Sequence, residues 1–208
     1  MQYGCGPFCA PEGWINFDAS PTLRIQRLPG VGPWLKKRMH VSFAPDILYG
    51  DILEGLSSIP KASCRGVYCS HVLEHLCLED CRKAIQNTYA LLEPGGRFRC
   101  VVPDLEWAAR SYIAGLEAED PEANIHFLSH TMLGTQTRSR DLKSMAMKTF
   151  GNQQHLYMWD RISLKNILVQ AGFSQVRPCT YHDSTDPMFL AVEEASRFDH
   201  AVAMEAIR

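Results

Sequence analysis

Polar side chains that could bind a ligand or move a proton follow two apolar runs near the middle of the chain. Ser70 and His71 come directly after the run at residues 66–69, and Asp104 follows the run at residues 97–102. A segment with the apolar spacing of one helix face separates the runs and ends at Pro-Gly-Gly. Two strands joined through a helix are normally parallel, so we expect the three side chains at one edge of a sheet. Open α/β sheets bind their ligands at this edge.

His71, Asp104 and His155 are the candidates for acid–base chemistry. His71 is the first choice as a base, because an unperturbed histidine titrates near neutral pH. His155, Tyr157 and Trp159 lie in the segment HLYMWD, between an irregular stretch and the last expected helix. We expect them to form a substrate wall. Ordinary aromatic packing is the alternative for these side chains.

Two glycines and two acids also stand where short strands are expected to end. Gly4 and Gly6 follow the first few residues, Asp18 ends the segment WINFD, and Asp51 follows ILYG. Glycine lets a cofactor approach the backbone closely, and an acid at the next strand tip can accept hydrogen bonds from a ribose diol. A plain glycine-rich turn is the alternative. A nicotinamide fingerprint fits poorly, because Cys9 stands where that motif needs a glycine.

The segment from His71 to His75 matches the H-x-x-E-H pattern of some zinc peptidases. A zinc-dependent hydrolase that uses His71 and His75 is therefore an alternative function. The match falls where a strand ends rather than inside a long helix, and no clear acidic ligand follows it. We therefore expect no metal site, and we expect His75 to be a packed, hydrogen-bonded side chain.

The order of elements predicts one α/β domain over residues 1–208, with a substrate-cap insertion at about residues 120–159. The expected fold is a Rossmann-like, doubly wound and mostly parallel seven-stranded sheet with an antiparallel closing strand pair. We place the closing strands at residues 173–181 and 187–193. Residues 19–45 are rich in proline and glycine and are expected to hold at most one short helix, near residues 34–39. Asp160 is expected to cap the last helix.

Composition limits the partners. The net charge of −2 gives no general attraction to nucleic acid or to an anionic membrane. No apolar run is long enough for a membrane span, and no signal peptide is recognisable. Eight cysteines are too few for a disulfide scaffold in a chain of this length and suit a reducing compartment. We expect a cytoplasmic protein, either a monomer or a homodimer, that does not bind nucleic acid.

Taken together, these motifs resemble those of the class I S-adenosylmethionine-dependent methyltransferases, and within them the type 11 subgroup. The segments GCG, WINFD, YGDIL, SHVLEHL and LLEPGGRF occur in the order that this family shows. The later segment AGFSQVR is similar to the turn into its sixth strand. The resemblance covers nearly the whole chain, apart from roughly residues 20–45 and 120–155.

The resemblance implies a function and a set of cofactor contacts. It implies methyl transfer from S-adenosylmethionine to a small-molecule or glycan-like acceptor. The residues that it assigns to cofactor binding are Gly4, Cys5, Gly6, Asp18, Asp51, Ile52, Ser70 and His71. Gly4, Cys5 and Gly6 would support the methionine end, Asp18 the ribose, and Asp51 with Ile52 the adenine.

The chain departs from the family pattern at its glycine motif. Phe8 stands in place of the third glycine, Gln2 in place of a frequent acid, and only three residues precede Gly4. This altered motif keeps an alternative open, a non-catalytic module that binds S-adenosylmethionine for a regulatory purpose.

Overall fold

The computed structural model describes residues 1–7, 12–39, 41–134 and 154–208. Seven strands form one sheet in the order β3-β2-β1-β4-β5-β7-β6. The strands are β1 (Gln2–Tyr3), β2 (Asn16–Asp18), β3 (Ile47–Tyr49), β4 (Cys64–Ser70), β5 (Leu92–Pro103), β6 (Ser174–Pro178) and β7 (Ala201–Ile207). Strands β1 to β5 are parallel to one another, and β7 is antiparallel to both β5 and β6. This confirms the expected Rossmann-like α/β fold.

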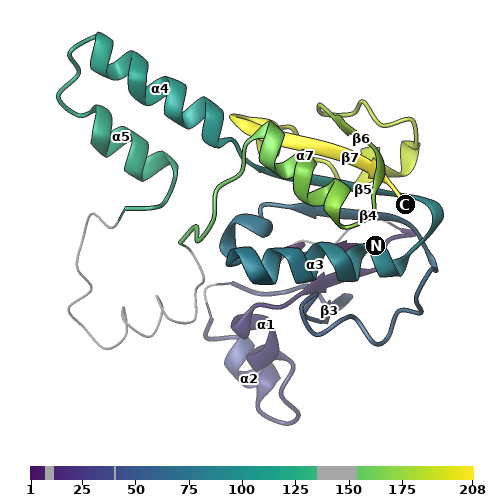
Figure 1. Cartoon of the computed structure of the whole chain (residues 1–208). Helices are drawn as coiled ribbons and strands as arrows, with labels where there is room; N and C mark the ends of the chain where they lie inside the picture. The colour runs from purple at the N-terminus through teal and green to yellow at the C-terminus, as the bar shows by residue number, and fades with distance from the viewer. Residues whose placement is uncertain (8–11, 40, 135–153) are drawn as a thin grey trace.

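Helices α3 (Leu78–Leu91) and α7 (Arg161–Gln170) cover one face of the sheet (Figure 1). Along β5, Phe98 and Cys100 point to this face and join the main hydrophobic cluster, in which Ile85 and Leu168 come from the two helices. Alternate side chains of a strand point to opposite faces, so every second residue of β5 contributes to this layer. As expected, the Asp160 side chain caps α7 by accepting from Ile162 N at 2.7 Å.

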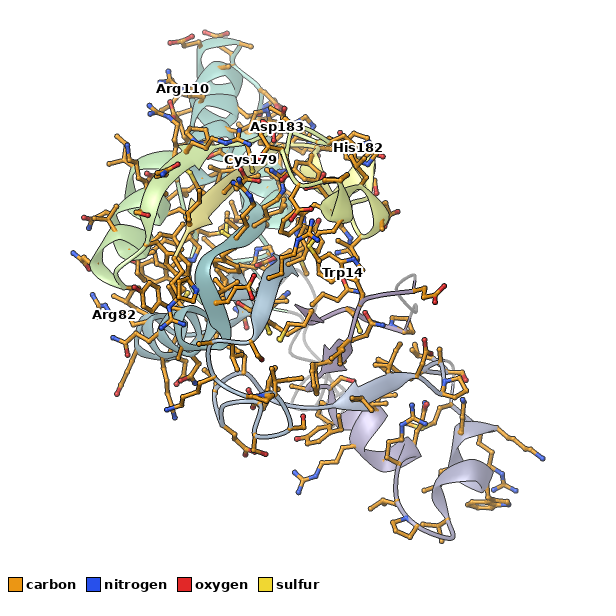
Figure 2. The ribbon with its side chains drawn as sticks, turned by 90° about the vertical axis from the view of Figure 1, so that its right-hand side faces the viewer. Trp14, Arg82, Arg110, Cys179, His182 and Asp183 are labelled. Atoms are coloured by element: carbon orange, nitrogen blue, oxygen red, sulfur yellow. The ribbon has the colours of Figure 1, made fainter. Side chains whose placement is uncertain are left out.

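The other face of β4, β5 and β7 is covered by residues 179–200, which we call the strap. The strap contains the 3₁₀ helices η2 (Pro187–Ala191) and η3 (Ala195–Phe198). Phe189 of the strap packs edge-on against Trp14, with ring centroids 5.8 Å apart. In Figure 2, Trp14 and His182 lie on one side of the sheet, and Arg82 of α3 lies on the opposite side. The strap therefore covers this face of the sheet, as α3 and α7 cover the other.

The position expected for the last strand is wrong. Residues 187–193 were expected to close the sheet, but η2 occupies this region and β7 lies further on, at Ala201–Ile207. Pro187 lacks the N–H that a central strand needs, and the Asp186 side chain accepts from Met188 N at 3.1 Å, which starts the 3₁₀ turn.

Residues 19–45 also hold more helix than expected. Both α1 (Pro21–Gln26) and α2 (Gly32–Lys36) form there, and α2 lies near the single expected helix. The Ser20 hydroxyl accepts from Leu23 N at 3.2 Å, and Pro21 occupies the first turn, where its missing N–H costs nothing.

Helices α4 (Leu105–Glu117) and α5 (Ala123–His130) follow β5 and extend away from the sheet (Figure 1). The expected cap, at about residues 120–159, begins within this pair. Of that stretch, residues 135–153 lie outside the described residues, so the cap stays a prediction. None of the described helices has the length and apolar character needed to cross a bilayer.

Candidate active site

A cleft of about 580 Å³ opens at the carboxyl ends of β1, β2, β3 and β4. The sequence placed polar residues at these strand ends, and the sheet brings them together. Seven of the eight predicted cofactor residues line the cleft, namely Gly4, Gly6, Asp18, Asp51, Ile52, Ser70 and His71. The eighth, Cys5, packs instead against the small cluster of Leu23, Phe43 and Ile47.

Gly4 shapes the wall of this cleft between β1 and β4. Its φ is +65°, a conformation that residues with a side chain adopt rarely. A Cβ at this position would overlap the Cγ2 methyl group of Val72, in the turn after β4. The first turn can therefore lie against the β4 turn only because residue 4 has no side chain.

The two acids present carboxylates to the cleft. Asp18 is buried, and its oxygens accept hydrogen bonds from Gly6 N at 2.9 Å and from Ser20 N at 2.8 Å. Asp51 accepts from Leu53 N at 2.8 Å. Since a carboxylate can accept about four hydrogen bonds, both side chains retain acceptor capacity for the hydroxyl groups of a ligand. These two acceptors, with apolar Ile52 beside them, could accept hydrogen bonds from the ribose diol of a nucleoside.

His71 lies between two acceptors. Its Nε2 is 2.9 Å from the Arg197 carbonyl oxygen, and its Nδ1 is 3.2 Å from Glu74 Oε1. Burial disfavours the charged ring, but the contacts with Glu74 and with the Arg197 carbonyl outweigh burial and raise the pKa of His71. Because both neighbours are acceptors, the doubly protonated ring is the form that presents an N–H to each of them.

The other two acid–base candidates do not line the cleft. Asp104 caps α4, because its side chain accepts from Glu106 N at 2.8 Å. His155 is buried and packs edge-on against His75, with ring centroids 5.1 Å apart. Burial is the main cause that lowers the pKa of His155, and repulsion from His75 adds to it.

The expected substrate wall is also separate from this cleft. Trp159 is 2% exposed and belongs to the main hydrophobic cluster, and Tyr157 packs against its ring at 4.8 Å. These contacts are those of the packing alternative. A substrate role for His155, Tyr157 and Trp159 stays a prediction.

Two cleft residues were not among the site residues that we predicted. Leu156 lines the cleft from the segment before α7, and Arg197 lines it from η3 of the strap. Leu156 lies within the HLYMWD segment, where we predicted site roles for His155, Tyr157 and Trp159 but not for Leu156. Arg197 carries no local signal, since it reaches the cleft only because the strap folds back along the sheet.

A second cavity, of about 610 Å³, lies between α4 and α5. Aromatic rings form much of its wall, with Trp107 and Tyr112 from α4 and Phe127 from α5. Trp107 stacks on His200, with ring centroids 3.9 Å apart, and this contact ties α4 to the residue before β7. The cavity begins one helical turn beyond Asp104, at the same edge of the sheet as the cleft.

Residues 3–177 match the family model of a methyltransferase domain. The chain belongs to this methyltransferase family. This confirms the expected enzyme class, a class I methyltransferase that depends on S-adenosylmethionine. The family match therefore favours a methyltransferase over the zinc-dependent hydrolase that the H-x-x-E-H pattern suggested.

Solved structures of methyltransferases resemble this methyltransferase distantly. A SAM-dependent methyltransferase from Archaeoglobus fulgidus is 16% identical, with 100% of this chain and 84% of that chain covered and a TM-score of 0.47. A possible histamine N-methyltransferase from Thermotoga maritima is 14% identical, with 99% and 80% covered and a TM-score of 0.47. The magnesium protoporphyrin IX methyltransferase from Synechocystis PCC 6803, with bound SAH, is 15% identical, with 100% and 72% covered and a TM-score of 0.46.

Other matches are longer proteins. The methyltransferase chain spans 44% of PigF and 47% of the CurJ carbon methyltransferase. No curated protein sequence matches it.

Proposed function

We propose that this protein is a type 11-like methyltransferase that transfers the methyl group of S-adenosylmethionine to a small-molecule or glycan-like acceptor. One observation carries the proposal. The cleft collects Gly4, Asp18 and Asp51 from the ends of three successive strands, with an acceptor-rich wall that suits a ribose.

We assign the cofactor contacts by their place in the cleft. Asp18 would accept from the ribose hydroxyls, Asp51 and Ile52 would hold the adenine edge and face, and the turn at Gly4 and Gly6 would lie beside the methionine end. The bound cofactor supplies a methyl group on a positively charged sulfur. The protein then has to align the acceptor with this group and exclude water, and both tasks depend on placement.

Among the three acid–base candidates, His71 has the position that suits proton transfer, because it lines the cleft. To take a proton from an acceptor, the ring would first have to lose its Nε2 proton and release the Arg197 carbonyl, which accepts from this nitrogen. We therefore propose that His71 orients the acceptor and serves as a base only when this contact opens. Asp104 and His155 remain weaker proposals, since neither lines the cleft.

The cavity between α4 and α5 favours the proposal that the acceptor is a small organic molecule. Aromatic and apolar walls with a few polar groups are typical of sites for small molecules. Here Ser111, His126 and His130 are polar members of such a wall. We propose that the acceptor binds between this cavity and the cleft.

Six described cysteines, Cys64, Cys69, Cys77, Cys81, Cys100 and Cys179, are free thiols, which supports our proposal of a reducing, cytoplasmic environment. A monomer or a homodimer remains our expectation for the assembly.

Calorimetric titration with S-adenosylmethionine tests the cofactor assignment. We expect Asp18→Ala and Asp51→Ala each to weaken binding at least about tenfold, since each removes a hydrogen bond that the cofactor would donate to a carboxylate, worth roughly 1.5–3 kcal/mol. Asp46→Ala is the matched control, because Asp46 is an exposed acid just before β3 that does not line the cleft. Unchanged affinity in both cleft variants, with the folded state verified by circular dichroism, would contradict the assignment.

The non-catalytic, regulatory alternative uses the same cofactor site but predicts no methyl transfer. A non-catalytic module binds S-adenosylmethionine but transfers nothing, whereas the enzyme passes a labelled methyl group to some member of a panel of small molecules and glycans. Labelled product from any acceptor in the panel excludes the alternative.

A further inference from the structure

Three metal-ligating side chains meet at the wall of the cleft, which His75 lines. Glu74 and His75 belong to η1 (Leu73–His75), the turn after β4, and His155 comes from the segment before α7. One potential ligand atom from each lies within 4.8 Å of the others. The group contains His75 from the H-x-x-E-H match but replaces His71 with His155, which is distant in sequence.

The Glu74 carboxylate is the first indication of a binding site. The residue is fully buried, and among the described residues neither oxygen receives a hydrogen bond of normal geometry. His71 Nδ1 lies 3.2 Å from Oε1, on one side of the carboxylate, and Oε2 has no described partner. A buried carboxylate without adequate partners is costly, and buried charges are usually paired or coordinate metals.

The two histidines are oriented as metal ligands usually are. His75 Nδ1 is 3.2 Å from the Gln154 carbonyl oxygen, so this nitrogen carries the proton and Nε2 is left as the acceptor. A metal-bound histidine commonly donates its other N–H to a backbone carbonyl in this way. His155 is 5% exposed, and its Nδ1 has no hydrogen-bond partner among residues 1–7, 12–39, 41–134 and 154–208.

We propose that Glu74, His75 and His155 bind a divalent transition metal ion, with Zn²⁺ as the ion that fits best. Two imidazoles and one carboxylate form a known zinc ligand set. Tetrahedral ligands at about 2.0–2.2 Å from zinc lie roughly 3.3 Å apart, so small side-chain rotations from the observed spacing would complete the site. This proposal differs from our expectation, from the sequence, that the chain has no metal site.

The site joins two segments that form part of the cleft. The Glu74 carbonyl already accepts from Leu156 N at 2.7 Å and from Tyr157 N at 3.2 Å. A metal ion would add a stronger link between the same segments, because His155 directly precedes Leu156, which lines the cleft. The ion would thus act as a structural clamp that holds one wall of the cleft in place.

The test is zinc binding by the full chain after removal of metal with a chelator. We expect calorimetry to give one Zn²⁺ per chain, and Co²⁺ in its place to give the visible absorption of a low-symmetry site. Loss of a partner of a metal ligand already weakens metal binding about 10–100-fold. We therefore expect Glu74→Gln and His155→Gln to weaken zinc binding by at least about a hundredfold.

The control is His126→Gln. His126 is exposed and has Asp120 and Glu122 at 3.2 and 3.7 Å, so it offers the same ligand types without burial. Binding should persist in this variant and in Asp18→Ala, whose defect concerns the cofactor. Because zinc is titrated without S-adenosylmethionine, the result is independent of the methyltransferase proposal.

Two results would overturn the inference. One is an absence of zinc binding by the unaltered chain, which would leave Glu74 to be balanced by protonated histidines alone. The other is zinc binding that Glu74→Gln and His155→Gln both retain, which would place the ion elsewhere in the chain. The two ligand variants change different segments, so a folding defect in one leaves the other to decide.

Discussion

Arg99 on β5 and Glu205 on β7 lie directly opposite each other in the sheet and form an ion pair of 3.0 Å in which both side chains are buried. Arg99 also contacts Glu193 of the strap at 2.5 Å and Asp183 at 3.0 Å. One guanidinium therefore joins the sheet to the strap. Figure 2 shows Asp183 close to Cys179, where the strap leaves β6.

Arg99→Met is expected to destabilise the protein by about 3–5 kcal/mol, because it leaves Glu193 and Glu205 buried without their cation. The free energy of unfolding in urea measures this loss. Arg110→Met is the control. Arg110 pairs with Glu106 on the exposed face of α4, and such pairs contribute only about 0.3–0.5 kcal/mol. Equal effects of the two substitutions would mean that the buried network does not stabilise the strap.

The same network predicts a loss of stability in acid. Burial alone would raise the pKa of Glu205, but hydrogen bonds from Ser184, Arg99 and Arg177 hold it below the ordinary value of 4.5. A group whose pKa is lower in the folded state stabilises the protein above its unfolded-state pKa. This contribution is lost as the pH falls through the folded-state pKa.

Melting temperatures measured from pH 7 to pH 3 should therefore fall below about pH 4.5, the ordinary value for this carboxyl group. In Glu205→Gln the protein should start from a lower stability and show a shallower fall, because one of the responsible groups no longer titrates. A fall of the same steepness in the variant would assign the acid sensitivity to other carboxyl groups.

Gly4 and Gly6 offer a matched pair of substitutions at the cleft. Both have positive φ, but an added Cβ meets Val72 only at Gly4 and has no neighbour within 4 Å at Gly6. Gly6→Ala should cost only the backbone strain, about 1 kcal/mol. Gly4→Ala should cost more and weaken S-adenosylmethionine binding at least about tenfold.

Adding Val72→Ala to Gly4→Ala separates the two causes. The smaller side chain removes the overlap but not the strain, so the double variant should recover part of the stability and cofactor affinity. Unfolding and calorimetric titration measure both. If the double variant binds no better than Gly4→Ala, steric overlap with Val72 is not the reason.

Trp107 tests the proposed acceptor region. Its ring stacks on His200 and lies 4.3 Å from the ring of His130, so it holds α4 and α5 next to the sheet. Trp107→Ala should raise the KM for the acceptor at least about tenfold and leave the affinity for S-adenosylmethionine unchanged. Trp34→Ala, in exposed α2, is the control and should change neither quantity. A loss of affinity for S-adenosylmethionine in the Trp107 variant would contradict the assignment of Trp107 to the acceptor region.

Local patterns predicted the elements whose stability is mostly local or whose apolar spacing is regular. Helix α3 has both regular spacing and a proline-glycine stop, and the acids at the ends of β2 and β3 follow short apolar runs. Strand β7 was missed because AVAMEAI is rich in residues that favour helices, and its pairing between β5 and β6 overrides this preference.

The candidate site divides in the same way. Residues at strand ends, such as Asp18 and Asp51, were found because the topology of parallel sheets puts strand ends together. Arg197, Leu156 and the grouping of His155 with Glu74 were not found, because each depends on how a distant segment folds back. No spacing within the sequence encodes such a contact.

The place of β7 in the sheet has a consequence for the order of folding. β7 lies between β5 and β6, and β6 is at the edge with β7 as its neighbour. During synthesis, β6 therefore emerges from the ribosome before it has a strand to pair with, and β5 keeps an open edge. The parallel half, from β3 to β5, can assemble first. We expect the docking of residues 201–207 to close the gap afterwards and to bury Glu205 against Arg99. The strap and its Arg197 would then reach the cleft late in folding.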